Sequence, residues 1–444
     1  MSEINLFDLD RLSRAEREAL MTRTEADLSA YLGPVQEIID AVRTEGDAAV
    51  ARFGREFDKA DVHADRLMAT PEEFEQAFAT LEPEVQGAIA FAVENIRAFH
   101  EVQKPETMWL KETRPGVFAG ERTTPIPSVA CYVPRGKGVF PSVMMMTAIP
   151  AVIAGVPEIA VLTPPTPDGG IDAASLVAAR MAGVERVYKC GGAVAVAAVA
   201  FGTRTIPRCI KIVGPGSPWV VAAKKLLADR IDTGLPAGPS EAIVLADATA
   251  NGRIAALDLL VEAEHGPDSS AFLVTDSRAV AEAARAAIPD YWQRMGAERV
   301  GYTQAVLGGP RGGILLAADM DQAIAFANDY APEHLAVLSD EPLQYLSRLQ
   351  HAGEILLGEN AVLTLGNYLI GPNCVLPTGG HARSWSPLSV LDFTKRTSIA
   401  HVTRAGYRTL APYAHTLATY EGFDAHANAV SSLRDTTACS PNET

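Results

Sequence analysis

Two kinds of hydrophobic pattern follow one another along the chain. Up to about residue 110, runs such as "EVQGAIAFAVENIRAFHEVQ" (84–103) place apolar residues at helical spacing. From about 125 to 245, short β-type runs such as "SVACYVP" (128–134) and "EIAVLTPP" (158–165) alternate with Gly-rich turns and helical runs. This alternation predicts βαβ units, and therefore an α/β protein with a parallel sheet.

A second series of the same kind follows between about 240 and 375. The strand-like run "EAIVLAD" (241–247) precedes the helical run "RIAALDLLVEAEHG" (253–266), and "AFLVTD" (271–276) precedes another helical run. We therefore expect a second α/β layer. The C-terminal stretch mixes a β-type run with a helix over 410–430, and the residues before 110 are expected to form an outer helical layer.

Length and charge limit the classes of protein that remain. A chain of 444 residues forms roughly two to four domains at the usual domain size. The 38 Lys and Arg against 54 Asp and Glu give a net charge of −16, which argues against nucleic acid or an anionic membrane surface as partner. The N-terminal residues lack the pattern of a signal peptide, and prolines interrupt the longest apolar run, so no membrane span is expected.

The cysteines indicate a reducing compartment. No two of them form a C-x-x-C pair, and their number is odd. A disulfide framework is therefore not expected, and a cytoplasmic location fits better. The five are Cys131, Cys190, Cys209, Cys374 and Cys439.

Two Gly-rich turns follow predicted strands, at Gly191-Gly192 and at Gly214-Pro215-Gly216. Backbone N–H groups at a helix N-terminus can hold a phosphate, and glycine lets the ligand approach closely. Neither turn is a complete G-x-G-x-x-G. Each therefore fits a plain βα turn as well as it fits nucleotide binding.

Two Glu-His pairs are candidates for chemistry. Glu262 and His265 are three residues apart at the end of a predicted helix, so they can share one helix face, either as metal ligands or as a solvated surface. Glu333 and His334 are adjacent and follow a proline. A proline there predicts a helix start, with both side chains near an exposed helix end. Such a pair could supply two separate proton-transfer groups.

The C-terminal part adds further polar candidates. The stretch "GNYLIGPNCVLPTGGHARS" (366–384) is rich in Gly, Asn and Pro and predicts a structured loop, with Asn367, Cys374 and His381 as its polar or reactive members. For Cys374 a small buried residue is favoured over a nucleophile or a thiolate ligand. "EGFDAHANAV" (421–430) offers Glu421 and His426.

Together these stretches resemble the histidinol dehydrogenase family. The matching runs occur in family order over nearly the whole chain, which is highly specific for membership and much less specific for substrate. The runs are "VRTEGDAAV", "NIRAFHEVQ", "YVPRGKGVFPS", "KIVGPG", "PAGPSEAIVLAD", "AEHGPDS", "NDYAPEHL", "GPNCVLPTGG", "LSVLDFTKR" and "EGFDAHANAV".

The resemblance implies a fold and a pair of cofactors. Members of the family are domain-swapped homodimers with two incomplete Rossmann-like domains and small tail domains, and they use zinc and NAD. For this chain it predicts an N-terminal helical segment (1–124), two Rossmann-like domains (125–240 and 241–380) and a C-terminal tail (381–444). Members oxidise a primary alcohol to a carboxylate through an aldehyde, in two hydride transfers.

The resemblance also implies residue roles. His334 matches the base that takes the alcohol proton, and Glu333 matches the residue that activates water for attack on the aldehyde. The zinc positions map to Glu262, His265, Asn367 and His426. Besides these metal positions and His334, the substrate positions map to Ser240, Cys374 and Glu421, and the dinucleotide positions map to Tyr132, Val194 and Ser217.

The chain departs from the family pattern at five of these positions. The family usually has Gln where Glu262 stands and Asp where Asn367 stands, so the two exchanges together keep one carboxylate and one amide. We interpret this as a relocated carboxylate in a retained metal site, since oxygen and imidazole ligands still suit zinc. The family's Gln and Asn at the dinucleotide positions are Val194 and Ser217 here, and a substrate-side His is Cys374.

The changed pocket indicates a substrate other than L-histidinol, because a site built for one polar substrate rejects analogues that leave its groups unpaired. The leading hypothesis is zinc- and NAD-dependent oxidation of a small polar primary alcohol. The alternatives are authentic L-histidinol dehydrogenase, oxidation of 2,3-dihydroxypropane-1-sulfonate, and a metal-binding homologue without dehydrogenase activity. A sulfonate would need cationic partners, for which His381 and Arg383 are candidates.

Overall fold

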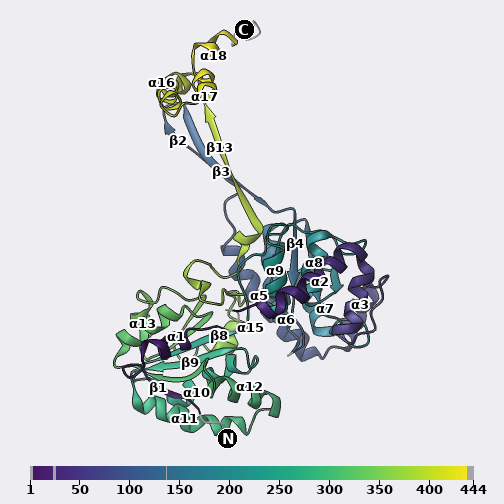
Figure 1. Cartoon of the computed structure of the whole chain (residues 1–444), viewed down its shortest axis with the longest axis vertical. Helices are drawn as coiled ribbons and strands as arrows, with labels where there is room; N and C mark the ends of the chain where they lie inside the picture. Colours follow the sequence, from purple (N-terminus) through teal and green to yellow (C-terminus); the bar gives the residue numbers. More distant parts are fainter. Residues whose placement is uncertain (1–3, 24–26, 137, 438–444) are drawn as a thin grey trace. The chain divides into compact units, whose positions relative to one another are not determined.

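The computed structural model describes residues 4–23, 27–136 and 138–437, with the side chains of 435–437 left aside (Figure 1). Cys439 lies outside these residues. The chain divides into two compact units. The larger unit comprises Met1–Lys104 and Ile126–Phe393, and the smaller unit comprises Pro105–Pro125 and Thr394–Thr444. The predicted boundaries at 124, 240 and 380 stay predictions.

The first sheet of the larger unit is parallel and has the order β6-β5-β4-β7. Each strand is followed by a helix, as the alternation of sequence patterns predicts. The elements in chain order are β4 (Ser128–Tyr132), α6 (Pro141–Ala154), β5 (Glu158–Thr163), α7 (Ala173–Ala182), β6 (Val187–Lys189), α8 (Gly192–Phe201), β7 (Ile212–Val213) and α9 (Pro218–Leu226).

Helices cover both faces of this sheet. Successive strand residues point to opposite sides, and the residues of β4 are buried on both. Val129 and Cys131 of β4 belong to the core that also includes residues of α6 and α7, whereas Ala130 and Tyr132 belong to the core on the other face. The N-terminal helices each contribute residues to one of these two cores. They are α2 (Ser29–Glu45) and α3 (Asp47–Phe57) on the Tyr132 side, and α4 (Pro71–Thr80) and α5 (Pro83–Val102) on the Cys131 side.

The second sheet is also parallel and has the order β1-β10-β9-β8-β11-β12. Its strands are β1 (Leu6–Asp8), β8 (Glu241–Ala246), β9 (Ser270–Thr275), β10 (Gly312–Leu316), β11 (His334–Leu338) and β12 (Glu354–Leu357). The accompanying helices are α1 (Arg14–Leu20), α10 (Gly252–Ala263), α11 (Arg278–Trp292), α12 (Ala297–Leu307), α13 (Met320–Tyr330), α14 (Leu343–Leu346) and α15 (Leu363–Tyr368).

This sheet is likewise buried on both faces. Val244 and Leu273 pack in the core of α10, α11 and α12, and Ile243 and Phe272 pack in the core of α13. A parallel sheet that is covered on both faces consists of near-continuous apolar strands. That explains why "AIVLA" and "AFLV" contain no polar residue.

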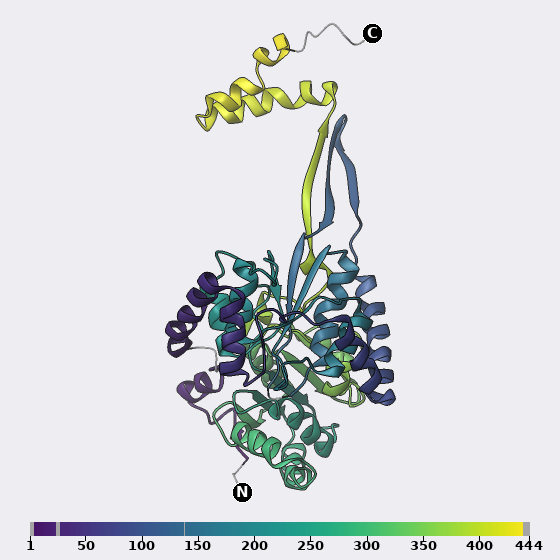
Figure 2. The same cartoon turned by 90° about the vertical axis from the view of Figure 1, so that its right-hand side faces the viewer.

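The smaller unit has a different construction. Three antiparallel strands pair in the order β13-β3-β2, and Figure 2 shows them as a long ribbon. The strands are β2 (Met108–Arg114), β3 (Val117–Pro125) and β13 (Thr394–Val402), and the helices are α16 (Arg404–Tyr420), α17 (Asp424–Ala429) and α18 (Ser432–Thr437).

The structure corrects two expectations about local structure. The segment up to residue 124 contains three strands, β1, β2 and β3, besides its helices. The stretch after Pro332 is not a helix start: His334 begins the buried strand β11, where the apolar residues after it pack into the sheet. Local propensity favoured a helix here, and burial between β8 and β12 overrides it.

Within the described ranges, no helix has the length and apolar character needed to cross a bilayer.

Candidate active site

The Glu333-His334 pair lies at the amino edge of the second sheet. His334 is opposite Ala242 of β8 and Glu354 of β12, so its backbone is fixed from both sides. Glu333 precedes the strand, and its Oε2 accepts a hydrogen bond of 2.9 Å from the backbone N–H of Glu241. The His334 Nε2 and Glu333 Oε1 atoms are 3.9 Å apart. Both side chains are therefore held side by side on rigid strand ends.

A third carboxylate orients the imidazole. The Glu354 Oε2 lies 3.0 Å from His334 Nδ1, and both side chains are buried. Gly366 makes room for this carboxylate, since a Cβ at that position would come within 3.0–3.1 Å of both Glu354 oxygens. With Nδ1 engaged, Nε2 is the nitrogen left to take up a proton.

The charged groups around His334 are mostly carboxylates. Burial would lower the pKa of His334, but the carboxylates of Glu262 and Glu333, with the hydrogen bond to Glu354, raise it to about 10. Burial raises the pKa of Glu333 well above its ordinary value, and Glu262 adds to this while His334 opposes it. The site thus holds more buried carboxylates than nearby cations, which favours binding of a further positive charge.

Glu262 and His265 come from the end of α10, where Glu262 is 1% exposed and His265 follows the last helical turn. The His265 Nδ1 is 3.2 Å from Glu262 Oε2 and 3.1 Å from the carbonyl oxygen of Val261. The Asn367 amide of α15 donates a 2.8 Å hydrogen bond to Glu262 Oε1. The structure therefore brings together three of the four predicted metal positions.

Glu262 is an ionised group in this setting. Burial alone would raise its pKa, but His265, His334 and hydrogen bonds from Asn367 and Ser240 hold the pKa below its ordinary value. A buried carboxylate that stays ionised beside an imidazole is a suitable ligand for a divalent cation.

These side chains line one cavity of about 420 Å³. Its walls combine the amino edge of the second sheet with the turns after β4 and β7 of the first sheet. The predicted residues that line it are Ser217, Ser240, Glu262, His265, Glu333, His334, Asn367 and Cys374. Burial raises the pKa of the Cys374 thiol, so this side chain is a neutral wall group.

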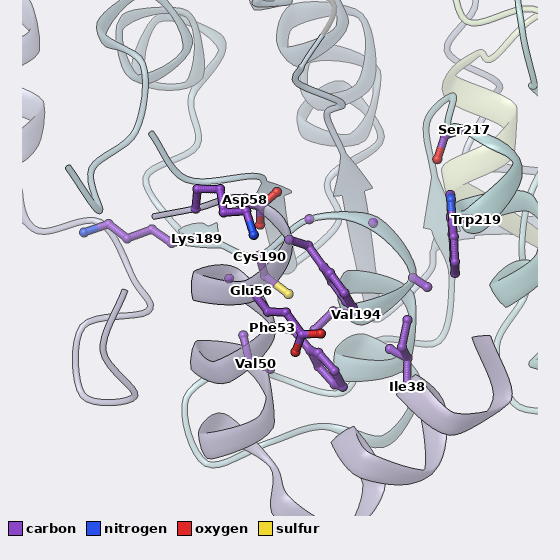
Figure 3. Close-up of a pocket in the computed structure, with 16 residues that line it drawn as sticks. Ile38, Val50, Phe53, Glu56, Asp58, Lys189, Cys190, Val194, Ser217 and Trp219 are labelled. Carbon is purple, nitrogen blue, oxygen red and sulfur yellow. The ribbon is translucent and has the colours of Figure 1, made fainter. Parts of the chain in front are cut away.

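A second cavity of about 420 Å³ lies at the carboxyl edge of the first sheet, where Val194 and Ser217 line it together with Asp58 and Trp219 (Figure 3). Tyr132 is buried beneath this edge, and its hydroxyl accepts a 3.1 Å hydrogen bond from the N–H of Gly192. The predicted dinucleotide positions therefore gather at the Gly-rich turns.

The turn after β7 depends on glycine. Gly214 has a φ of +116°, and a Cβ there would lie 2.1 Å from the carbonyl oxygen of Tyr132. The absence of a side chain lets the turn pass directly over the end of β4. Ser217, which follows this turn, lines both cavities.

Known proteins resemble this chain over nearly its whole length. A family model described as histidinol dehydrogenase matches residues 21–434. The chain belongs to the histidinol dehydrogenase family. It is 60% identical to "Histidinol dehydrogenase homolog 2" of Mesorhizobium japonicum over 98% of this chain and 99% of that protein. It is 47% identical to a histidinol dehydrogenase of a Synechocystis strain, over 96% and 98% of the two chains.

The crystal structure of histidinol dehydrogenase from Elizabethkingia anophelis superposes with a TM-score of 0.92. The two sequences are 31% identical, and the match covers 99% of this chain and 100% of that chain. The predicted mixed α/β fold with two parallel sheets is therefore confirmed.

The side chains in this cavity are suited to zinc, the metal that the family resemblance implies. Glu262 and Asn367 offer oxygen and His265 offers its Nε2, and this mixture of oxygen and imidazole ligands suits zinc. Among the described residues, no group of three His, Cys, Asp or Glu side chains is placed to hold a metal. Asn367 contributes an amide, which is not one of these four residue types, beside the carboxylate of Glu262 and the imidazole of His265.

The remaining predicted residues lie elsewhere in the chain. Glu421 and His426 belong to the smaller unit, at the end of α16 and in α17, and both are exposed. His381 lines a cavity next to Thr22, and Arg383 donates to the carbonyl oxygen of Asp329. Neither of the suggested sulfonate partners lines the site cavity.

Sequence reasoning missed two residues of the site. Glu354 is a single acidic residue at the start of a short strand, and nothing in the local sequence distinguishes it from a surface Glu. Arg135 lies in the matched run "YVPRGKGVFPS" and lines the site cavity. A basic residue next to glycine just after a strand is the signal that could have identified it.

The Glu262–Asn367 contact predicts the outcome of exchanging the two residues. Glu262→Gln alone should lower zinc affinity more than about tenfold, because only neutral ligands remain. Glu262→Gln with Asn367→Asp should restore much of it, since the hydrogen bond between the two positions is kept with donor and acceptor reversed.

Competition titration with a chromogenic chelator measures this affinity, with Glu282→Gln on the exposed face of α11 as the control. Equal affinity in the single and double variants would rule out a relocated carboxylate.

The second cavity predicts a pH effect on stability. Burial raises the pKa of Asp58 to about 6, with the charge of Arg135 acting in the opposite direction. Because the pKa of Asp58 is higher in the folded protein than in the unfolded chain, its protonation stabilises the fold. This stabilisation is complete below the unfolded-state pKa, near 4, and is lost as the pH rises through the folded-state pKa of about 6. Between pH 4 and pH 7, the free energy of unfolding of Asp58→Asn should therefore rise by about 1–2 kcal/mol relative to that of the wild type.

Urea unfolding at both pH values measures the difference, and Asp65→Asn, at an exposed position, is the control. An unchanged pH dependence in Asp58→Asn would contradict the burial of this carboxylate.

Proposed function

We propose that the protein is a zinc- and NAD-dependent dehydrogenase that oxidises a small polar primary alcohol to the carboxylate through an aldehyde. The observation that carries this proposal is the shared cavity. It joins a Glu-His pair suited to proton transfer, three adjacent zinc-type donors and the Gly-rich edge of a nucleotide-type sheet. Each part has other uses alone, and their combination in one space favours this reaction.

His334 is the base of the first step in its neutral form, which a divalent cation held by Glu262 would favour by offsetting the carboxylate charge that raises the pKa of His334 to about 10. Its Nε2 is directed to the cavity because Nδ1 is held by Glu354. It takes the hydroxyl proton while the carbon-bound hydrogen leaves as hydride to NAD, which gives the aldehyde and NADH. A positioned base of this kind contributes typically 10²–10⁴-fold to the rate.

Glu333 acts in the second step. Burial raises its pKa, which makes its carboxylate a stronger base towards water. It takes a proton from the water that adds to the aldehyde carbon. The hydrate then gives a second hydride to a second NAD, and the acid is released. One alcohol, one water and two NAD+ thus yield one carboxylate, two NADH and three protons.

Glu262, His265 and Asn367 would hold the zinc ion, and its chemistry is to polarise the substrate oxygen. We propose that the fourth ligand is His426 of the partner subunit in a homodimer, and that Glu421 of the partner subunit contacts the substrate. Both residues are exposed in the smaller unit, so they are available to a second chain.

The walls of the cavity favour a substrate other than L-histidinol. Cys374 is a neutral thiol with little capacity to bind an imidazole, and the acidic groups nearby restrict where an anionic substrate can sit. A small polar alcohol anchored by the metal positions and Ser240 is the class that fits best.

A panel of alcohols tests this function. Zinc-loaded protein is incubated with NAD and each of several amino, sulfonated and carboxylated primary alcohols, L-histidinol included, and NADH is followed at about 340 nm. We expect turnover of at least one member with two NADH per alcohol, and weaker turnover of L-histidinol. Absence of turnover with every alcohol, in protein that carries a full zinc load, would favour a binding role.

A matched pair of variants separates the two steps. Glu333→Gln should stop after the first hydride and give one NADH per alcohol, together with free aldehyde. The exposed Glu341→Gln changes the same charge and should keep two. Two NADH per alcohol in Glu333→Gln would remove Glu333 from the second step.

A further inference from the structure

Arg135 is the sole Arg or Lys among the described residues that line the site cavity. It follows β4 by three residues and so belongs to the carboxyl edge of the first sheet. Carboxylates of Glu262, Asp268 and Glu333 line the same cavity. A guanidinium is the side chain best suited to hold an anionic part of a ligand through paired N–H donors.

The guanidinium has spare capacity for a ligand. Its Nη1 donates to the carbonyl oxygen of Pro165, in the loop after β5, at 3.3 Å. Its Nε is buried and has no hydrogen-bond partner. No carboxylate of the described residues forms an ion pair with it. A buried N–H without a partner costs free energy, which a bound anion would recover.

Arg135 also acts on the neighbouring cavity. Asp58 lines that cavity, and Arg135 is the nearby charge that lowers the pKa of this carboxyl against the effect of burial. Ser217 lines both cavities. In Figure 3, Asp58 and Lys189 lie on one side of the cavity, and Ser217 and Trp219 lie on the other. The two cavities therefore share Ser217 in their walls, and Arg135 lines one of them and acts electrostatically on Asp58 in the other.

A ligand that extended from one cavity into the other would pass Ser217, the residue that lines both. One end would lie against the Gly191-Gly192 turn and the other beside His334. In a dinucleotide the middle is the diphosphate, which carries two negative charges and accepts paired N–H donors from a guanidinium. Arg135 stands at the end of the first sheet, whereas the reacting groups stand on the second sheet and line the same cavity.

We propose that Arg135 binds the diphosphate of the dinucleotide. This inference rests on the proposed NAD-dependent function and adds a residue that the resemblance does not assign. It also accounts for the apolar Val194 and the short Ser217 at the two other contact positions. A charged partner at the centre of the cofactor replaces polar contacts that these side chains cannot make.

Binding measurements without turnover test the proposal. Dissociation constants for NADH, ADP-ribose and adenosine are measured by fluorescence and by displacement of NADH, on zinc-loaded protein. Arg135→Gln should weaken NADH and ADP-ribose about tenfold to a hundredfold, as expected for the loss of one charge-assisted contact. Adenosine, which has no diphosphate, should bind as tightly as to the wild type.

Two more variants complete the test. Arg135→Lys keeps the charge without the paired donors and should fall between Arg135→Gln and the wild type. Arg186→Gln removes an exposed guanidinium, paired with Glu158, at the amino end of β6, and should leave all three dissociation constants unchanged.

Three results would overturn the proposal. Unchanged NADH and ADP-ribose affinities in Arg135→Gln, with a raised KM for anionic alcohols alone, would assign Arg135 to the substrate. An equal loss of adenosine binding would indicate a structural role. Failure of the wild type to bind NADH would remove the dinucleotide function itself, and this failure would appear without any variant.

Discussion

Burial of several carboxylates around one imidazole is the constraint on which the rest of the site depends. Glu262, Glu333 and Glu354 all act on the protonation of His334 from buried positions. Removing charges from water is costly unless each is paired or hydrogen-bonded. The structure meets this cost with fixed groups at strand and helix ends, such as the Asn367 amide. Rigid placement of proton-transfer groups is therefore a direct result of satisfying these charges.

The two sheets contribute opposite edges to this arrangement. The first sheet presents the carboxyl ends of its strands, where turns follow β4, β6 and β7, and this is the usual ligand side of an open α/β sheet. The second sheet presents its amino edge, with Ser240, Glu333 and Glu354 at or just before the starts of strands. The Gly-rich edge of the first sheet thus faces the Glu-His edge of the second sheet across one cavity, an arrangement that suits the proposed oxidation by a dinucleotide.

Much of this could be predicted from the sequence, and the exceptions have physical causes. Periodicity was sufficient for the two parallel sheets, since strands buried on both faces are continuously apolar. It misplaced Glu333 and His334 on a helix end, because local propensity carries no information about pairing with β8 and β12. Glu354 could not be found, since its role arises from strand register alone. Arg135 needed the cavity, because a lone basic residue after a strand has many uses.

The metal-centred account makes a direct claim about the ligands. It places zinc among oxygen and imidazole donors from Glu262, His265 and Asn367, beside the neutral thiol of Cys374. X-ray absorption at the zinc edge of the zinc-loaded wild type measures the nearest shell. The account predicts nitrogen and oxygen neighbours at about 2.0–2.2 Å, and a sulfur neighbour at about 2.3 Å would contradict it.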